Sequence, residues 1–329
     1  MPSIRTAVVG VGSLGRHHLR WLSRLPNSTL VGLHDIDTQK ARQYADEYGV
    51  TAFAKLEDLA GQVDAVSVVV PTTAHFEVGS FLINNGIHCL IEKPITPKLE
   101  EADQLHHLAG EMGVKVTVGQ IERFNPAVMA LADTDIKPSF IEGHRLAPFD
   151  PRGTDVAVVL DLMIHDIDLV LHFIKSELVD IQASAVAVVS DRADIANARL
   201  TFANGAVANL TASRISLHAM RKLRIFQKSG YYSLDLAKKE ADLYSLATDG
   251  SGGGGFRVPL GKSGQDLLYR KVADSGKDML GTELETFLQA VIDDRPVAVT
   301  LAEATDALRV ALDIQRIGQE SIERMMAAD

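Results

Sequence analysis

The first 120 residues alternate short apolar runs with amphipathic stretches, and this alternation restricts the fold more than any other feature of the chain. Apolar runs rich in β-branched residues occur at 4–10, 29–35, 63–71, 87–94 and 114–120. Strands that are buried on both faces have this composition. Apolar residues at helical spacing occur at 14–25, 38–49 and 98–113. Regular β–α alternation predicts a doubly wound parallel sheet with right-handed crossovers.

The pattern changes after about residue 122. An extended piece at 140–148 precedes a helical stretch at 160–173, and turn signals such as Asn204-Gly205 then separate longer strand-like runs. These runs lie at 181–190, 195–213 and 222–236. We therefore expect an α/β protein of two domains, 1–122 and 123–329. The second should be an α+β domain with a large, mostly antiparallel open sheet, followed by two amphipathic helices.

Composition excludes several classes of protein. The chain is 46% apolar and 23% charged, as globular proteins are. Its net charge of −10 argues against a nucleic-acid partner, because such binders carry a basic footprint. The single cysteine, Cys89, allows no intramolecular disulfide and suits a reducing compartment. No apolar run approaches the ~20 residues that span a bilayer, and no signal peptide is evident. We expect a cytoplasmic protein without a membrane partner.

The segment GVGSLG places Gly10, Gly12 and Gly15 in a GxGxxG pattern. The pattern follows a predicted strand and opens a predicted helix, which is the context of a dinucleotide-binding loop. The first glycine permits a tight turn, the second lets the backbone approach a pyrophosphate, and the third allows close packing. Ser13 and Leu14 begin the helix, whose N-terminus would bind the phosphates. Domain 1–122 is therefore predicted to bind NAD, and domain 123–329 to bind substrate.

Asp35 ends the second predicted strand, where a carboxylate can accept hydrogen bonds from the ribose hydroxyls. A carboxylate there repels a 2′-phosphate, and the next residue is Ile36 rather than a cation. These residues favour NAD over NADP. The competing interpretation is a glycine turn with an unrelated aspartate.

The apolar stretch 160–173 carries a narrow polar stripe. Asp161, His165, Asp168 and His172 fall on one face of an α-helix. One interpretation is an ordinary solvent-exposed face, although such faces usually carry Lys, Glu, Arg and Gln. The other is a face that meets a cofactor and substrate in a cleft between the domains.

Several segments together resemble one known family. They are GVGSLGRHH (10–18), PTTAHFE (71–77), IEKPIT (91–96), VGQIERFNPA (118–127) and LDLMIHDIDL (160–169). Their order and spacing resemble the glucose-fructose oxidoreductase/inositol dehydrogenase (Gfo/Idh/MocA) family of NAD(P)-dependent oxidoreductases. The resemblance covers essentially the whole chain. It implies a second domain whose open sheet builds homodimers or homotetramers.

The resemblance also implies roles for the residues that bind the cofactor. Glu92, Lys93 and Pro94 match the family's Glu-Lys-Pro motif, whose lysine reaches the reacting hydroxyl. Pro71 and His75 match a loop that borders the nicotinamide. The cofactor site is thus expected to include these residues together with the glycine loop and Asp35.

Asp161 and His165 match the family's catalytic pair, and physical chemistry gives the same roles. His165 suits a general base, since imidazole titrates near neutral pH. Asp161 can orient the imidazole and stabilise its protonated form. Lys93 can stabilise the developing alkoxide. Asp168 and His172 are interpreted as supporting or domain-contact residues.

The substrate is less sharply defined. Segments 145–171 and 209–227 resemble those of family members that oxidise the 3-hydroxyl of UDP-N-acetylglucosamine for lipid A synthesis. A diphosphate should meet cationic and polar side chains. The expected substrate contacts are Arg123, Asn125, Arg152 and His165, with Arg214 as a further candidate. Two alternatives remain, a dehydrogenase of a free sugar or polyol and a non-catalytic NAD-binding sensor. No metal ligand set is predicted.

Overall fold

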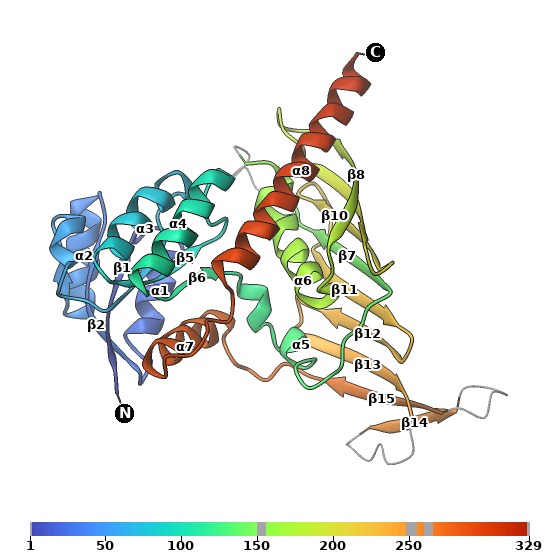
Figure 1. The fold of residues 1–329 in the computed structure, drawn as a ribbon, viewed down its shortest axis with the longest axis horizontal. Coiled ribbons are helices and arrows are strands. Elements are labelled where there is room, and N and C mark those ends of the chain that lie inside the picture. The colour runs from blue at the N-terminus through green and yellow to red at the C-terminus, as the bar shows by residue number, and fades with distance from the viewer. Residues whose placement is uncertain (1, 150–155, 248–254, 260–265, 328–329) are drawn as a thin grey trace. The chain divides into compact units, whose positions relative to one another are not determined.

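The protein is described by a computed structural model that covers residues 2–149, 156–247, 255–259 and 266–327. The chain forms two compact units (Figure 1). Unit 1 comprises Met1–Ile121 and Asp278–Leu308, and unit 2 comprises Glu122–Lys277 and Arg309–Asp329. No helix within the described ranges has the length and apolarity needed to cross a membrane.

Unit 1 contains a six-stranded parallel sheet in the order β3-β2-β1-β4-β5-β6. The strands are β1 (Ile4–Val9), β2 (Ser28–His34), β3 (Thr51–Ala52), β4 (Ala65–Val68), β5 (His88–Glu92) and β6 (Val116–Gly119). The helices are α1 (Gly15–Leu22), α2 (Thr38–Tyr48), α3 (His75–Asn84), α4 (Leu99–Met112) and α7 (Met279–Ile292). Short 3₁₀ turns lie at Leu56–Leu59 and Thr72–Ala74, and a third, Ile121–Phe124, lies where the chain passes from unit 1 to unit 2. The doubly wound parallel sheet is confirmed, and its order is the Rossmann order.

Helix α7 completes the core of unit 1. Its Leu284 and Phe287 belong to the buried cluster that contains Val8 and Leu19. Gly281 of the same helix lies against the Trp21 ring, where a Cβ would come within 2.9 Å. The sequence predicts a domain boundary between residues 122 and 123. In the structure, the later segment Asp278–Leu308 also belongs to unit 1. The difference arises because an amphipathic helix shows that one face is buried, not which core buries it.

Unit 2 is built on a nine-stranded sheet in the order β14-β15-β13-β12-β11-β7-β10-β9-β8. The strands are β7 (Phe140–Leu146), β8 (Leu178–Val186), β9 (Ile195–Phe202), β10 (Val207–Ser213), β11 (Met220–Gln227), β12 (Gly230–Asp235), β13 (Glu240–Leu246), β14 (Phe256–Pro259) and β15 (Asp266–Val272). Strands β7 and β10 pair in parallel, and the other pairs are antiparallel. The predicted large, mostly antiparallel sheet is confirmed. Its last three strands were not predicted.

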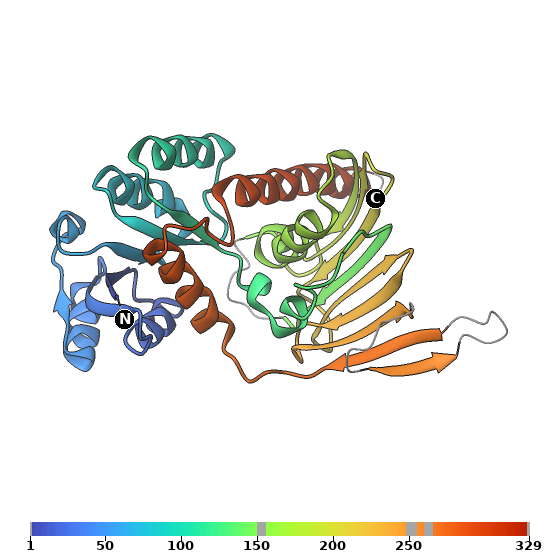
Figure 2. The ribbon, with the colours of Figure 1, turned by 60° about the horizontal axis from the view of Figure 1, so that its bottom comes forward.

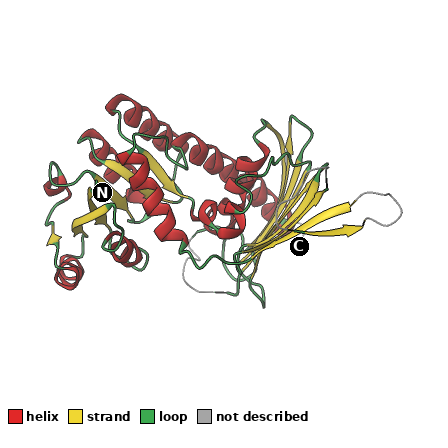
Figure 3. Ribbon diagram, turned by 90° about the horizontal axis from the view of Figure 1, so that it is seen from below, coloured by secondary structure: helices red, strands yellow, loops and turns green. Residues whose placement is uncertain are grey.

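Helices cover one face of this sheet, and its other face carries none among the described residues (Figures 2 and 3). The covering elements are α5 (Pro126–Met129), a π-helical turn at Val159–Met163, α6 (Ile164–Ile174) and the C-terminal part of α8 (Leu301–Met326). Gly143 of β7 leaves room for the neighbouring side chains on this face, since a Cβ there would lie 2.6 Å from Cδ2 of Leu210 and 3.2 Å from Cδ1 of Leu223. In the same way, a Cβ on Gly318 of α8 would lie 2.9 Å from the Cβ of Ala185.

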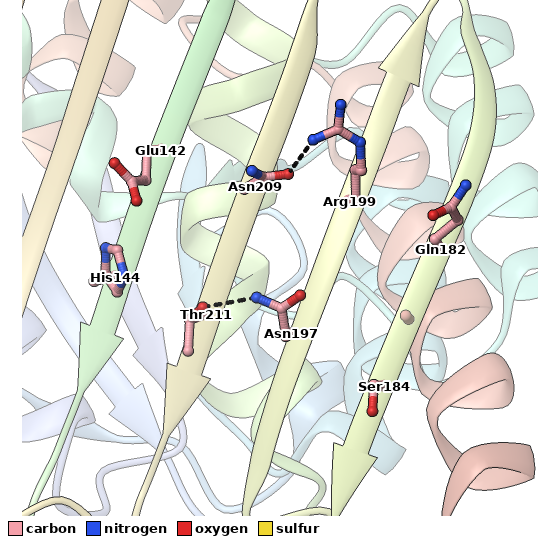
Figure 4. Close-up of a pocket in the computed structure, with 9 residues that line it drawn as sticks. Glu142, His144, Gln182, Ser184, Asn197, Arg199, Asn209 and Thr211 are labelled. Carbon is pink, nitrogen blue, oxygen red and sulfur yellow. Dashed lines mark hydrogen bonds between the residues drawn. The ribbon is translucent and has the colours of Figure 1, made fainter.

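The outer face of the sheet is divided into a polar and an aromatic part. The polar part lies over β7, β10, β9 and β8 and contains a shallow groove (Figure 4). The groove is lined by Glu142, His144, Gln182, Ser184, Asn197, Arg199, Asn209 and Thr211. Across β7, β11, β12, β13 and β15, five rings follow one another at centroid distances of 4.7–5.8 Å. They are Phe140, Phe226, Tyr231, Tyr244 and Tyr269. We name them the aromatic row.

Candidate active site

The loop between β1 and α1 meets the geometric demands of dinucleotide binding. Gly10 has a φ of +89°, and a Cβ there would lie 2.5 Å from the Val69 carbonyl oxygen. A Cβ on Gly15 would lie 1.9 Å from the Gly10 carbonyl oxygen. At Gly12, by contrast, no described atom lies within 4 Å of the corresponding position. Two glycines therefore let the loop close, and the middle one leaves its backbone open to a ligand.

Helix α1 begins at this loop without a side-chain cap. Leu14 occupies the N-cap position and makes no capping hydrogen bond, and both Ser13 and Leu14 are exposed. N–H groups in the first turn have no partner within a helix, and the helix dipole adds positive charge there. The loop and helix start together fit the pyrophosphate of a dinucleotide.

Asp35 connects the end of β2 to this loop. Its Oδ2 accepts a hydrogen bond from the Val11 N–H at 2.7 Å, and its Oδ1 accepts one from the Asp37 N–H at 2.8 Å. A carboxylate oxygen can accept two hydrogen bonds, so both oxygens keep capacity for a ribose hydroxyl. The neighbouring Ile36 is 94% exposed and brings no positive charge to this position.

The Glu-Lys-Pro segment begins at Glu92, the last residue of β5. The Glu92 carboxylate accepts a hydrogen bond from the Lys93 N–H at 3.3 Å, and its Oε1 lies 3.2 Å from Nε2 of His18. Nδ1 of His18 lies 2.6 Å from the Ser67 hydroxyl. A Cβ on Gly119 would lie 2.9 Å from the Glu92 carboxylate, so only glycine leaves room for it. The carboxylate of Glu92 is therefore held in a site that its neighbours confine.

The pattern of the sequence does not single out His18 as part of this site, but His18 is completely buried and reaches two strands. A signal for its burial was present. Gly15, His18, Leu19 and Leu22 follow the i, i+3, i+4, i+7 pattern of a buried helical face, and all four are buried.

His75 is the first residue of α3 and is only 1% exposed. Its Nδ1 lies 2.9 Å from the Pro94 carbonyl oxygen and 3.3 Å from that of Ile95, and its Nε2 lies 3.0 Å from that of Val70. Burial lowers the pKa of His75, and this effect exceeds the opposing effect of the carbonyls. Both ring nitrogens of His75 therefore face main-chain carbonyl oxygens. The loop that it fixes, which includes the exposed Pro71, is the part that a cofactor could reach.

The polar stripe in unit 2 is only partly exposed to solvent. Asp168 is 1% exposed, and its two oxygens accept hydrogen bonds from Nε and Nη2 of Arg123 at 2.7 and 2.8 Å. Nη1 of Arg123 lies 2.5 Å from Nδ1 of His172. Asp161 and His165 are partly exposed. Asp161 lies in the π-helical turn rather than in α6, where His165 lies, so the expected single α-helix is interrupted between Asp161 and His165.

Two further predicted substrate contacts are held inside the protein. Asn125 is completely buried, caps α5 by accepting from the Ala127 N–H, and donates to Glu122 and to the Leu236 carbonyl. This geometry gives Asn125 a capping role. Arg214 is 5% exposed and donates to the carbonyl of Val156. Arg152 lies outside the described residues.

A buried ion triad connects α6 to the sheet. Arg145 of β7 donates to Asp166 at 2.7 and 3.0 Å and to Glu122 at 2.8 Å, and all three side chains are at most 4% exposed. Asp166 therefore serves the packing of α6, although it is adjacent in sequence to His165.

The Rossmann sheet, the glycine loop and an acid after β2 define a dinucleotide-binding protein. Family models agree. The model of the oxidoreductase family with an NAD-binding Rossmann fold matches residues 4–120, and that of the GFO/IDH/MocA C-terminal domain matches residues 141–233. The chain belongs to the GFO/IDH/MocA family. It is an NAD(P)-dependent oxidoreductase that acts on CH–OH groups.

Relatives support this assignment along the whole chain. UDP-N-acetylglucosamine 3-dehydrogenase from Acidithiobacillus ferrooxidans is 38% identical over 96% of this chain and 97% of its own. A solved structure of that enzyme covers 98% of this chain and 99% of its own, with a TM-score of 0.88 and 37% identity. scyllo-Inositol 2-dehydrogenase (NAD(+)) from Bacillus subtilis is 29% identical over 65% of this chain and 68% of its own.

Proposed function

We propose that this protein is an NAD-dependent dehydrogenase of a sugar nucleotide, and that it oxidises the 3-hydroxyl of UDP-N-acetylglucosamine for cell-surface polysaccharide or lipid A synthesis. The observation that carries the proposal is the 38% identity, over nearly the full length of both chains, to an enzyme that bears that name. A cytoplasmic location follows from the same proposal, since NAD and sugar nucleotides are cytoplasmic metabolites.

The proposed cofactor site uses the residues of unit 1. The open backbone at Gly12 and the uncapped start of α1 bind the pyrophosphate, and Asp35 binds the adenosine ribose. Bound NAD supplies the acceptor for the hydride. The carboxylate of Asp35 and the uncharged Ile36 both disfavour a 2′-phosphate, which is the basis for proposing NAD rather than NADP.

Three side chains carry the proposed chemistry. His165 accepts the hydroxyl proton as general base. Asp161 stabilises the protonated imidazole that results. Lys93 stabilises the negative charge that develops on the hydroxyl oxygen as the hydride leaves the carbon.

Arg123 remains the proposed cation for the diphosphate. Asp168 and His172 orient its guanidinium, and a planar guanidinium is the cation that best matches the geometry of a phosphate. Arg152 is proposed for the same task on its sequence position alone.

The test is a spectroscopic screen for reduced nicotinamide. UDP-N-acetylglucosamine, UDP-glucose, glucose and myo-inositol are each supplied with NAD or NADP, with and without 2-oxoglutarate as a recycling acceptor. We expect reduction with UDP-N-acetylglucosamine and NAD. Turnover of myo-inositol alone would instead support a polyol dehydrogenase, as the inositol-dehydrogenase relatives suggest. NAD binding without turnover of any sugar would support a non-catalytic NAD-binding sensor.

We also propose a homodimer or homotetramer that assembles through the outer face of the sheet. The outer face of β9 and β10 is largely polar, with Asn197, Arg199 and Thr211. The proposal therefore rests on the aromatic row, because a contiguous apolar strip usually marks an interface.

A further inference from the structure

Lys93 lies between two main-chain positions that are each anchored by a buried histidine. Glu92, on its N-terminal side, is contacted by His18 of α1. Pro94, on its C-terminal side, is contacted by His75 of α3. Neither histidine belongs to the chemistry described above. Both are at most 1% exposed, so both rings were desolvated in order to make these contacts.

The first anchor joins three elements. The His18 ring lies between the Ser67 hydroxyl of β4, at 2.6 Å, and the Glu92 carboxylate of β5, at 3.2 Å. The carboxylate is confined on another side by Gly119, where a Cβ would lie 2.9 Å from Oε1. The position of Glu92, and so the direction in which the chain enters Lys93, is therefore fixed by side-chain contacts as well as by the strand.

The second anchor joins two loops. His75 places one ring nitrogen 2.9 Å from the Pro94 carbonyl oxygen and the other 3.0 Å from the Val70 carbonyl oxygen. Val70 follows β4 and Pro94 follows β5, so the ring lies between the carboxyl ends of two neighbouring strands, and in the neutral imidazole one ring N–H donates to one of the two carbonyls. Ligands of open parallel sheets bind at these strand ends.

We propose that His18 and His75 are positioning residues that hold the main chain on both sides of Lys93, so that its ammonium stays in one reactive position. This inference rests on the proposed catalytic role of Lys93. Neither histidine exchanges a proton with the substrate in this proposal. Each acts only through Lys93.

The variants distinguish the loss of the histidine nitrogens from a change in side-chain volume. His18→Phe and His75→Phe keep an aromatic ring and remove the nitrogens. His18→Gln restores a donor near the position of Nε2, and His75→Asn restores one near the position of Nδ1. Gly119→Ala displaces the Glu92 carboxylate without touching either histidine. His17→Phe is the matched control, because this neighbouring side chain makes no described contact with the Glu-Lys-Pro segment.

Two measurements are made on each variant. The first uses the cofactor-free protein and follows labelling of Lys93 by an amine reagent, by peptide mass spectrometry, with the exposed Lys98 as internal reference. The second measures NAD affinity by calorimetry, together with kcat and KM. Labelling does not require turnover. If the protein oxidises none of the sugars tested, the proposed function fails while the positioning role is still tested.

We expect both Phe variants and Gly119→Ala to change the Lys93-to-Lys98 labelling ratio and to lower kcat by up to about 10²-fold, as ångström-scale misplacement does. KM should change little. NAD affinity should change little in His18→Phe and Gly119→Ala, whereas His75→Phe should also lower it, because His75 fixes the loop that contains Pro71. His18→Gln and His75→Asn should recover part of the labelling ratio and part of kcat. His17→Phe should match the parent in both measurements. An unchanged labelling ratio in both Phe variants would overturn the proposal, even if their thermal stability fell.

Discussion

In the proposed mechanism His165 accepts the hydroxyl proton and Lys93 stabilises the hydroxyl oxygen, so we expect the removal of either side chain to slow the reaction. His165→Ala should slow single-turnover hydride transfer by ~10²–10⁴, which corresponds to about 3–5 kcal/mol. Lys93→Ala should also slow the transfer, because the developing alkoxide loses its charge partner. NAD affinity should change little in His165→Ala, since the residue does not belong to the proposed dinucleotide site.

The control for these variants must be an exposed carboxylate outside the stripe. Asp166 is unsuitable, because it pairs with the buried Arg145, and its removal should cost about 3–5 kcal/mol of stability. Glu177→Gln, at an exposed position beyond α6, should be silent within about ±0.5 kcal/mol. If His165→Ala transfers hydride as fast as Glu177→Gln, His165 is not the base.

Cofactor choice should depend on two adjacent side chains. Asp35→Ala combined with Ile36→Arg should shift preference toward NADP, because a repelling carboxylate is lost and a cation is added where a 2′-phosphate would lie. Isothermal titration with both dinucleotides measures the change. Tighter binding of NADP than of NAD by the unaltered protein would contradict the role assigned to Asp35.

At the scale of one element, the glycine loop allows a matched comparison. Gly12→Ala adds a methyl group in open space, so stability should stay within about 0.5 kcal/mol. The same methyl group obstructs the pyrophosphate, and NAD affinity should fall by at least about tenfold, or about 1.4 kcal/mol. Gly15→Ala should destabilise the fold by about 1–3 kcal/mol, because its Cβ would meet a carbonyl oxygen at 1.9 Å. Denaturant unfolding and calorimetry distinguish the two effects. Equal loss of stability in both variants would contradict this assignment.

The turn before β9 is held by a buried carboxylate. Oδ2 of Asp194 accepts hydrogen bonds from the N–H groups of Val188, Val189 and Ser190, and Oδ1 accepts one from the Ser190 hydroxyl. Burial alone would raise its pKa, but these bonds outweigh burial and hold the pKa of Asp194 below its ordinary value.

A depressed carboxyl pKa stabilises the fold above the unfolded-state pKa, and this contribution is lost as the pH falls through the folded-state pKa. Asp194→Asn should therefore cost about 1–3 kcal/mol at neutral pH and progressively less below about pH 4. Urea unfolding at several pH values measures the difference. A cost that does not depend on pH would mean that the charge of Asp194 is not what holds the turn.

The sequence predicted some elements well for a physical reason. Strands such as β1 and β5 are buried on both faces, so their apolar runs are continuous and easy to recognise. The π-helical turn at Val159–Met163 was not predictable, since the i, i+4, i+7 pattern assumes a regular 3.6-residue period. Strand β13 was missed because its outer positions are mixed, with Asp242 beside Tyr244.

The candidate site was predictable only in part. The glycines and Asp35 have fixed positions relative to β1 and β2, so a motif is sufficient to locate them. The capping role of Asn125 could have been read from the Pro126 that follows it, because Asn at the N-cap and Pro at the first helical position commonly begin a helix. The pairing of Arg123 with Asp168 depends on contacts between distant segments, which no local pattern encodes.

At the scale of the whole molecule, the aromatic row tests the proposed assembly. Tyr244→Arg places a charge among four other rings and should shift the oligomer toward monomer, because the charge must be desolvated in the interface. Glu111→Arg, on the exposed surface of α4, adds the same side chain elsewhere and should leave the mass unchanged. Light scattering at micromolar concentration measures both. A monomeric parent protein would rule out the assembly.

The place of α7 in unit 1 has a consequence for synthesis on the ribosome. The first 121 residues emerge early, but Leu284 and Phe287, which complete their core, emerge only after nearly all of unit 2. At typical translation rates of ~5–20 residues per second, the nascent unit would wait roughly ten seconds or longer with part of its apolar surface uncovered. Until then, we expect the uncovered apolar face around Leu19 to be a place where chaperones can bind.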